Sequence, residues 1–272
     1  MKKYLLLCLL LIGCSGIEKS ENQHIRMKNC KGEYISRHSE SYVYTIETPK
    51  RKVREPYFWE QGRAKNLCKI TKDFFRCKGS ILNPPVHDNV VDRTYYDCEG
   101  QEKHSLPIVH GKEGIYPILI EILNYLQVRT QKKVVITCGH RCPAHNSYAD
   151  RSKSNRASKH MIGAEVDFYI CGMENSPEKV ADLVMDFYRE NPKYHNLIHY
   201  QNFSRFDGKT NVSVKPWFNK EIFIKLFKKH EGRDFDNRHP YPYISLQVRF
   251  DKELDERVVY SWERANGLHL RF

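Results

Sequence analysis

The densest pattern in the chain is SKHMIGAEVDFYI, which spans Ser158 to Ile170. As a strand, its second half turns apolar side chains toward a core and turns Glu165, Asp167 and Tyr169 toward the opposite face. Carboxylates in so apolar a strand need compensation, because burying an unpaired charge is costly. A divalent metal ion would be an efficient partner for them.

Histidines near this strand and at the end of the chain fit such an ion. His160 lies in the turn before the strand, and Gly163 lets the chain bend so that the imidazole and the Asp167 carboxylate converge. In a strand over residues 267–272, His269 would share the polar face. If the two strands are neighbours, these three ligands leave a fourth position open to water, as in catalytic zinc sites. For each histidine alone, a surface or core role is the alternative.

The remaining patterns of the C-terminal half predict helices and strands around this site. Apolar residues recur at helical spacing over 115–126, and residues 176–190 open with a Ser-Pro-Glu helix start. Residues 133–137 are typical of a buried strand, and residues 243–250 alternate as a strand with one apolar face. We therefore expect an α+β domain over 109–272, with helices on a mostly antiparallel sheet.

The segment 29–108 has short β-like runs broken by polar and proline-containing turns, which predicts a small β-rich module. Seven cysteines lie after residue 14, and outside the cytosol they are expected to pair and leave one over. Natural pairings are Cys68 with Cys77, and Cys138 with either Cys142 or Cys171. A zinc-thiolate site is the alternative, which the lack of a CxxC pair disfavours.

The first 13 residues have the layout of an export signal, with an apolar run too short to span a bilayer as a helix. Residues 11–14 resemble the lipobox of bacterial lipoproteins, which implies cleavage before Cys14 and lipid attached to its sulfur. By the same resemblance, the non-acidic Ser15 favours the outer membrane. Residues 14–28 would then be a tether to the cell envelope, and an ordinary secretory signal is the alternative.

The chain is strongly basic, with a net charge of +12 and a sequence pI near 9.2. The basic residues are spread rather than clustered, so we expect no nucleic acid partner for an exported protein. Anionic envelope polymers or lipid headgroups are the expected targets, and a solvated basic surface without a specific partner is the alternative.

His160, Gly163 and Asp167 match the HxxGxxxD core of the zinc D-alanyl-D-alanine carboxypeptidases and related endopeptidases, which share a fold with hedgehog signalling domains. Residues 136–146 are similar to the strand, glycine and arginine that precede this motif in the family. The resemblance covers roughly residues 111–272. It implies a hedgehog/DD-peptidase-like fold and a peptidase that cleaves peptide stems or cross-links of peptidoglycan.

The resemblance also implies roles for single residues. Zn²⁺ would be held by His160, Asp167 and His269. Arg141 would clasp a peptide carboxylate with its two-pronged charged head, and a structural salt bridge is the alternative for it. Ser158 would hydrogen-bond the substrate or orient His160.

The chain departs from the family where many members carry a general-base carboxylate, because Asn266 stands three residues before His269. An amide cannot take a proton from water, so Glu165 is the preferred substitute base and Glu263 the second choice. A second departure is Arg271, where relatives often have an acidic residue.

Asn266 also favours a rival function, a noncatalytic peptidoglycan-binding lipoprotein that retains the fold. A weaker third possibility is an adhesin that binds through its N-terminal module.

Overall fold

A computed structural model describes residues 67–109, 111–150 and 157–270, which belong to one compact unit. The predicted export signal, the predicted lipidation site at Cys14, the predicted tether and Cys30 lie outside the described residues. Within those ranges no helix has the length and apolar character needed to cross a membrane.

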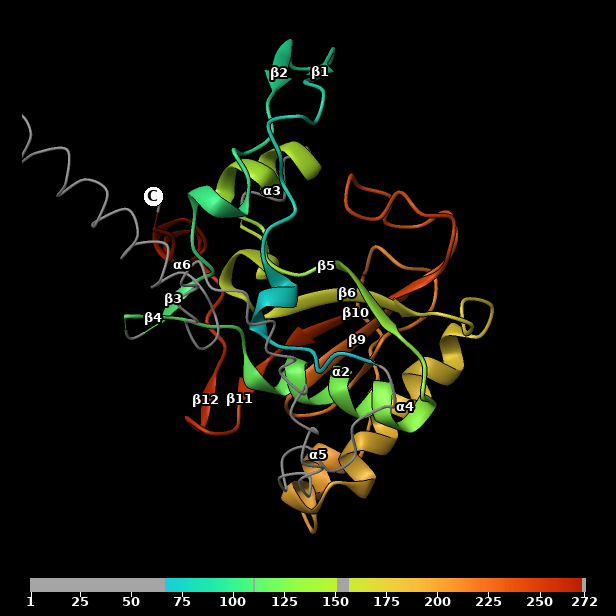
Figure 1. Cartoon of the computed structure of the whole chain (residues 1–272). Helices are drawn as coiled ribbons and strands as arrows, with labels where there is room; N and C mark the ends of the chain where they lie inside the picture. The colour runs from blue at the N-terminus through green and yellow to red at the C-terminus, as the bar shows by residue number, and fades with distance from the viewer. Residues whose placement is uncertain (1–66, 110, 151–156, 271–272) are drawn as a thin grey trace, which may run out of the picture. The chain divides into compact units, whose positions relative to one another are not determined.

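A six-stranded antiparallel sheet forms the centre of the unit, in the order β5-β6-β10-β9-β8-β7 (Figure 1). The described chain is therefore α+β, as predicted. The strands of this sheet are β5 (Val134–Cys138), β6 (Glu165–Ile170), β7 (Ser204–Arg205), β8 (Trp217–Phe218), β9 (Ile222–Phe227) and β10 (Tyr243–Val248).

Two fourteen-residue helices, α2 (Pro117–Thr130) and α4 (Pro177–Glu190), pack against this sheet and each other. Each begins with proline in its first turn, where the missing N–H costs nothing. Their apolar faces join alternate residues of β6, β9 and β10 in one core, as the periodicity predicted. The other face of the central strands is left for polar side chains, which positions the site.

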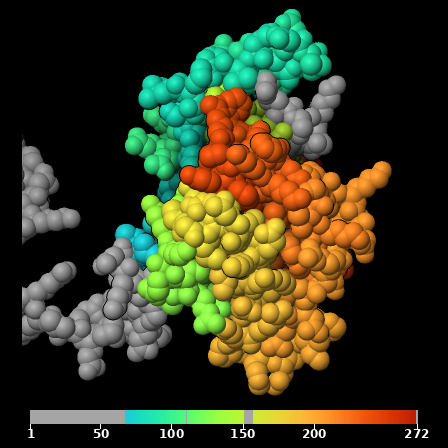
Figure 2. Space-filling model, turned by 90° about the vertical axis from the view of Figure 1, so that its right-hand side faces the viewer, coloured from blue at the N-terminus to red at the C-terminus, as the bar shows by residue number. Residues whose placement is uncertain are grey.

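Short elements surround the sheet, and the hairpin of β1 and β2 projects from one end of the described unit (Figures 1 and 2). These elements are η2 (Lys72–Phe75), β1 (Val86–Asp88), β2 (Arg93–Tyr95), η3 (Gln101–Lys103), β3 (Ile108–Val109), β4 (Lys112–Glu113), α3 (Pro143–Ala149), η4 (Lys159–Ile162), η5 (Pro192–Tyr194), α5 (Ile198–Gln201), β11 (Phe250–Asp251), β12 (Glu256–Arg257) and α6 (Trp262–Gly267).

Residues 67–108 do not build a core of their own, because Ile70, Phe75 and Leu106 are buried in the same core as the sheet and helices. Their strands are short, and the six cysteines of the described ranges are free thiols.

The expected disulfides are therefore not formed in the structure. Cys68 is exposed while Cys77 is buried beside Cys98, and Cys138 is bonded to neither Cys142 nor Cys171.

The strand expected over 267–272 is also not formed in its described part. Helix α6 extends to Gly267, with the Ser261 hydroxyl accepting from the Arg264 N–H at its start. The Leu268 and Leu270 carbonyls then accept from the backbone N–H groups of Ile108 and Ser105, at 2.7 and 3.0 Å. These backbone bonds carry the end of the chain to the 105–108 segment instead of to β6.

Gly163 ends η4 in the left-handed conformation, with φ of +70°, and turns the chain into β6. A Cβ there would lie 3.0 Å from Ile115 Cδ1, so Gly163→Ala adds crowding to backbone strain. We expect it to lower the free energy of unfolding by about 1–3 kcal/mol, measured by urea denaturation.

Gly114→Ala is the matched control, because a Cβ there meets nothing within 4 Å and φ is not left-handed. Equal stabilities of the two variants would contradict the role given to Gly163.

Candidate metal centre

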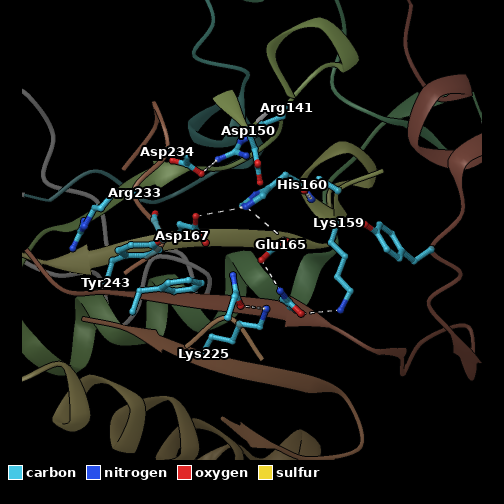
Figure 3. Close-up of a pocket in the computed structure, with 16 residues that line it drawn as sticks. Arg141, Asp150, Lys159, His160, Glu165, Asp167, Lys225, Arg233, Asp234 and Tyr243 are labelled. Atoms are coloured by element: carbon cyan, nitrogen blue, oxygen red, sulfur yellow. Dashed lines mark hydrogen bonds and ion pairs between the residues drawn. The ribbon is translucent and has the colours of Figure 1, made fainter. Parts of the chain in front are cut away.

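The site lies on the polar face of β6 and β10, where Asp167 pairs with Ser245 and Glu165 pairs with Gln247. A pocket of about 470 Å³ opens over this face, lined mostly by charged and hydroxyl side chains (Figure 3). η4 adds His160 to the pocket wall, and β9 adds Lys225.

His160 is held with one ring nitrogen facing the two carboxylates. Its Nδ1 lies 2.7 Å from the Gly139 carbonyl oxygen, to which it donates. Nε2 then faces Asp167 Oδ2 at 3.6 Å and Glu165 Oε2 at 3.7 Å (Figure 3). Ligand atoms that share a zinc ion at about 2.0–2.1 Å lie about 3.4 Å apart, so these separations are close to those of a coordinated set. A carbonyl on Nδ1 is also the usual way in which proteins orient a metal-binding imidazole.

The Asp167 carboxylate is buried and only partly satisfied. Oδ2 accepts from Asn237 Nδ2 at 2.9 Å, whereas Oδ1 has no hydrogen-bond partner among the described residues. Such an orphaned buried oxygen is costly unless a cation or water completes it. The donor set therefore fits a metal ion at this carboxylate.

Cys138, at the end of β5, pairs with Asp167 of β6. Cys138, His160 and Asp167 form a group of buried ligand atoms that lie within 4.8 Å of one another. Sulfur, imidazole nitrogen and carboxylate oxygen are all zinc ligands, so this group could hold a metal ion. Burial raises the pKa of the Cys138 thiol to about 12, although Arg141 opposes the shift. A metal ion would thus have to displace the thiol proton.

Glu165 is a fixed carboxylate at the edge of this group. Its Oε1 accepts from Ser245 Oγ at 2.7 Å and from Gln247 Nε2 at 2.6 Å. Burial raises its pKa, but the charges of His160 and Lys225 and these hydrogen bonds outweigh burial and lower the pKa to about 2. Glu165 is therefore ionised at neutral pH and leaves Oε2 facing His160.

The charge of His160 is set by the same groups. Burial lowers the pKa of its imidazole, but Cys138 and the two carboxylates of β6 outweigh burial and raise the pKa well above its ordinary value. The imidazole is therefore protonated when no metal ion is bound, and metal binding must release this proton as well.

Arg141 is committed to two aspartates of the loop before β10. Its Nη2 lies 2.5 Å from Asp234 Oδ2 and its Nε lies 2.6 Å from Asp236 Oδ2, while its side chain is 3% exposed. Arg141 Nε also donates to Cys138 Sγ at 3.0 Å. The structure thus places Arg141 in the salt bridge that was the alternative to clasping a substrate.

His269 and Glu263 are not brought to this group. The His269 imidazole stacks on His140, with 2.7 Å between their Nε2 atoms, because the end of the chain pairs with the 105–108 segment. Glu263 is exposed on α6 and does not line the pocket. Among the described residues, the compact metal-ligand group at β6 contains Cys138 in place of His269.

Ser158 lines the pocket, and its hydroxyl accepts from the backbone N–H of His160 at 3.3 Å, while its part in substrate binding stays a prediction. Sequence reasoning missed Asn237 and the pairing of Ser245 and Gln247 with Glu165. The polar face of residues 243–250 was visible as alternation, but its register against β6 was not. Asn237 lies in a loop and gave no signal.

Replacing Arg141 by Met removes the charge at similar volume, which leaves Asp234 without its cation and Asp236 with His145 alone. We expect Arg141→Met to lower the free energy of unfolding by about 3–5 kcal/mol, because breaking a buried pair strands the remaining charge. Thermal or urea denaturation measures this loss.

Arg129→Met is the control, since Arg129 and Glu190 form an exposed pair, 53% and 44% accessible, worth about 0–1 kcal/mol. If both variants lose equally little stability, the structural role of Arg141 is wrong.

The site is interpreted from its own geometry, because comparisons with known proteins give no relative to compare it with. No protein-family model, no curated protein and no solved structure matches the chain. The site is a buried group of Cys138, His160 and Asp167 that could hold a metal ion, and His160 and Asp167 of this group line the polar pocket.

Proposed function

We propose that the chain is a zinc-dependent peptidase of the bacterial cell envelope, with a hedgehog/DD-peptidase-like fold. The observation that carries the proposal is the buried group of Cys138, His160 and Asp167 within 4.8 Å of one another. The substrate class, peptide stems or cross-links of peptidoglycan, is supported by the HxxGxxxD motif. The envelope location, at the outer membrane, is supported by the lipobox-like sequence that ends at Cys14.

The pocket supplies groups for each part of peptide hydrolysis. When bound, zinc would polarise a carbonyl and lower the pKa of a water molecule. Glu165 Oε2 faces the same space and can accept a proton, while Ser245 and Gln247 hold Oε1 in place. Glu165 is ionised at neutral pH, as a base must be, so a contribution within the usual range for a general base is expected.

Lysines, rather than Arg141, are the cations that could meet an anionic peptide group. Lys159 and Lys225 line the pocket, and their Nζ atoms donate to the neutral amides of Gln247 and Asn211 at 2.8 and 3.0 Å. An incoming carboxylate could replace either amide and gain a charge-assisted bond.

A second candidate is the noncatalytic peptidoglycan-binding lipoprotein. It is favoured by a single imidazole in the metal-ligand group and by Arg141, which is engaged by Asp234 and Asp236. Such a protein would bind the same wall peptides in the same pocket without cleaving them.

The test is to incubate the purified full-length chain with zinc and isolated peptidoglycan, and to identify released peptides by mass spectrometry. We expect His160→Ala to lose pocket zinc and all release, because it removes the central ligand. Glu165→Gln should keep the zinc and slow release by about 10²-fold.

Glu263→Gln is the matched control, since Glu263 is exposed and outside the pocket, and it should cleave like the parent chain. Peptidoglycan that co-sediments with the parent chain but yields no peptides would favour the noncatalytic candidate. Zinc content unchanged in both His160→Ala and Cys138→Ser would overturn the metal assignment itself.

A further inference from the structure

We infer that Cys77, Cys98, His104 and Cys142 form a second metal site, one that holds a structural zinc ion. All four side chains are buried, and their ligand atoms lie within 4.8 Å of one another. They come from separate turns of the chain: Cys77 follows η2, Cys98 follows β2, His104 follows η3 and Cys142 precedes α3. None of them lines the pocket over β6.

Two distances within this cluster match edges of a zinc tetrahedron. Around zinc, with bonds of about 2.3 Å to sulfur and about 2.0 Å to nitrogen, two sulfurs lie about 3.8 Å apart and a sulfur and a nitrogen about 3.5 Å apart. Cys77 Sγ lies 3.9 Å from Cys98 Sγ, and Cys98 Sγ lies 3.5 Å from His104 Nε2. Three cysteines and one histidine make a closed set of four, as in structural rather than catalytic zinc sites.

The number of thiols also favours a metal ion over a disulfide. A disulfide between any two of the three cysteines would leave the third thiol and His104 buried beside it without use. Zinc engages all four side chains at once. The backbone N–H of His145 donates to Cys142 Sγ at 3.4 Å, which is the kind of outer hydrogen bond that stabilises a zinc-bound thiolate.

His104, and not His145, is the imidazole that is available to bind a metal ion in this cluster. His145 is also close, but its Nδ1 lies 2.6 Å from Asp97 Oδ1 and its Nε2 lies 2.9 Å from Asp236 Oδ1. Both ring nitrogens of His145 are therefore occupied by carboxylates. His104 presents Nε2 to Cys98 Sγ, as a ligand would.

The proposed site adds a further tie between residues 77–104 and the rest of the unit, beside the ion pair of Asp97 with His145. Among the described residues, the buried cluster of the three cysteines has the partly buried Ala144 as its one apolar neighbour, so packing contributes little there. Zinc would tie these turns to Cys142, next to Arg141 and close to Gly139, the carbonyl of which orients His160. Structural zinc would thereby stabilise the segment that supports the pocket.

The experiment replaces zinc with Co²⁺ in the purified full-length chain and records the thiolate-to-cobalt charge-transfer band, together with metal content per chain. Three thiolates predict a strong band in the parent chain. Cys77→Ser and His104→Ala should each lose one equivalent of metal and weaken the band. Cys171→Ser is the matched control, because Cys171 is a free cysteine outside the cluster, and it should keep both.

This inference does not depend on the proposed peptidase, and the two can fail separately. Cys138→Ser should lose only the metal of the pocket and keep most of the charge-transfer band. Cys142→Ser should keep the metal of the pocket but lose the metal of the cysteine cluster and most of the band. A disulfide between any two of Cys77, Cys98 and Cys142, found by mass spectrometry of the native chain, would overturn the zinc site. Metal content unchanged in both Cys142→Ser and His104→Ala would overturn it as well.

Discussion

The burial of two carboxylates on one strand is the constraint on which the pocket depends. Glu165 and Asp167 stand on β6, whose other face lies in the core, so neither can turn toward bulk water without breaking the sheet. Because desolvating each charge costs several kcal/mol, every neighbouring segment contributes a compensating group. β10 supplies Ser245 and Gln247, and η4 supplies the imidazole between the carboxylates. The charges of Glu165 and Asp167 are thus compensated by groups from the sheet, from η4 and from the loop before β10.

A second layer of charge connects the pocket to the rest of the unit. Arg141 joins the end of β5 to Asp234 and Asp236, and Asp236 continues through His145 to Asp97. Burial lowers the pKa of His145, but the two aspartates outweigh it and raise the pKa to about 10, so the imidazole stays charged at neutral pH. Alternating charges along this chain let several ionisable groups remain buried together.

Local patterns predicted the fold class, the two long helices and the strands β5, β6 and β10, because periodicity depends on residues close in sequence, whereas β9 was not predicted. The same holds for His160, Gly163 and Asp167, which lie within eight consecutive residues. Partners supplied by distant segments could not be predicted. The register that sets Ser245 against Asp167, and the packing that gathers three cysteines, depend on the whole fold. Alternating leucines near the end of the chain predicted a strand, but helix α6 extends to Gly267, and beyond it the Leu268 and Leu270 carbonyls accept from the backbone of residues 105–108 instead.

The attachment of Leu270 to Ser105 has a consequence for how the protein matures. These two residues are 165 positions apart, so almost the entire described chain must exist before this contact can form. Contacts between such distant positions carry a large loop-closure cost and tend to form late. This edge can therefore close only once the chain as far as residue 270 is available, after the local helices and hairpins have had the chance to form.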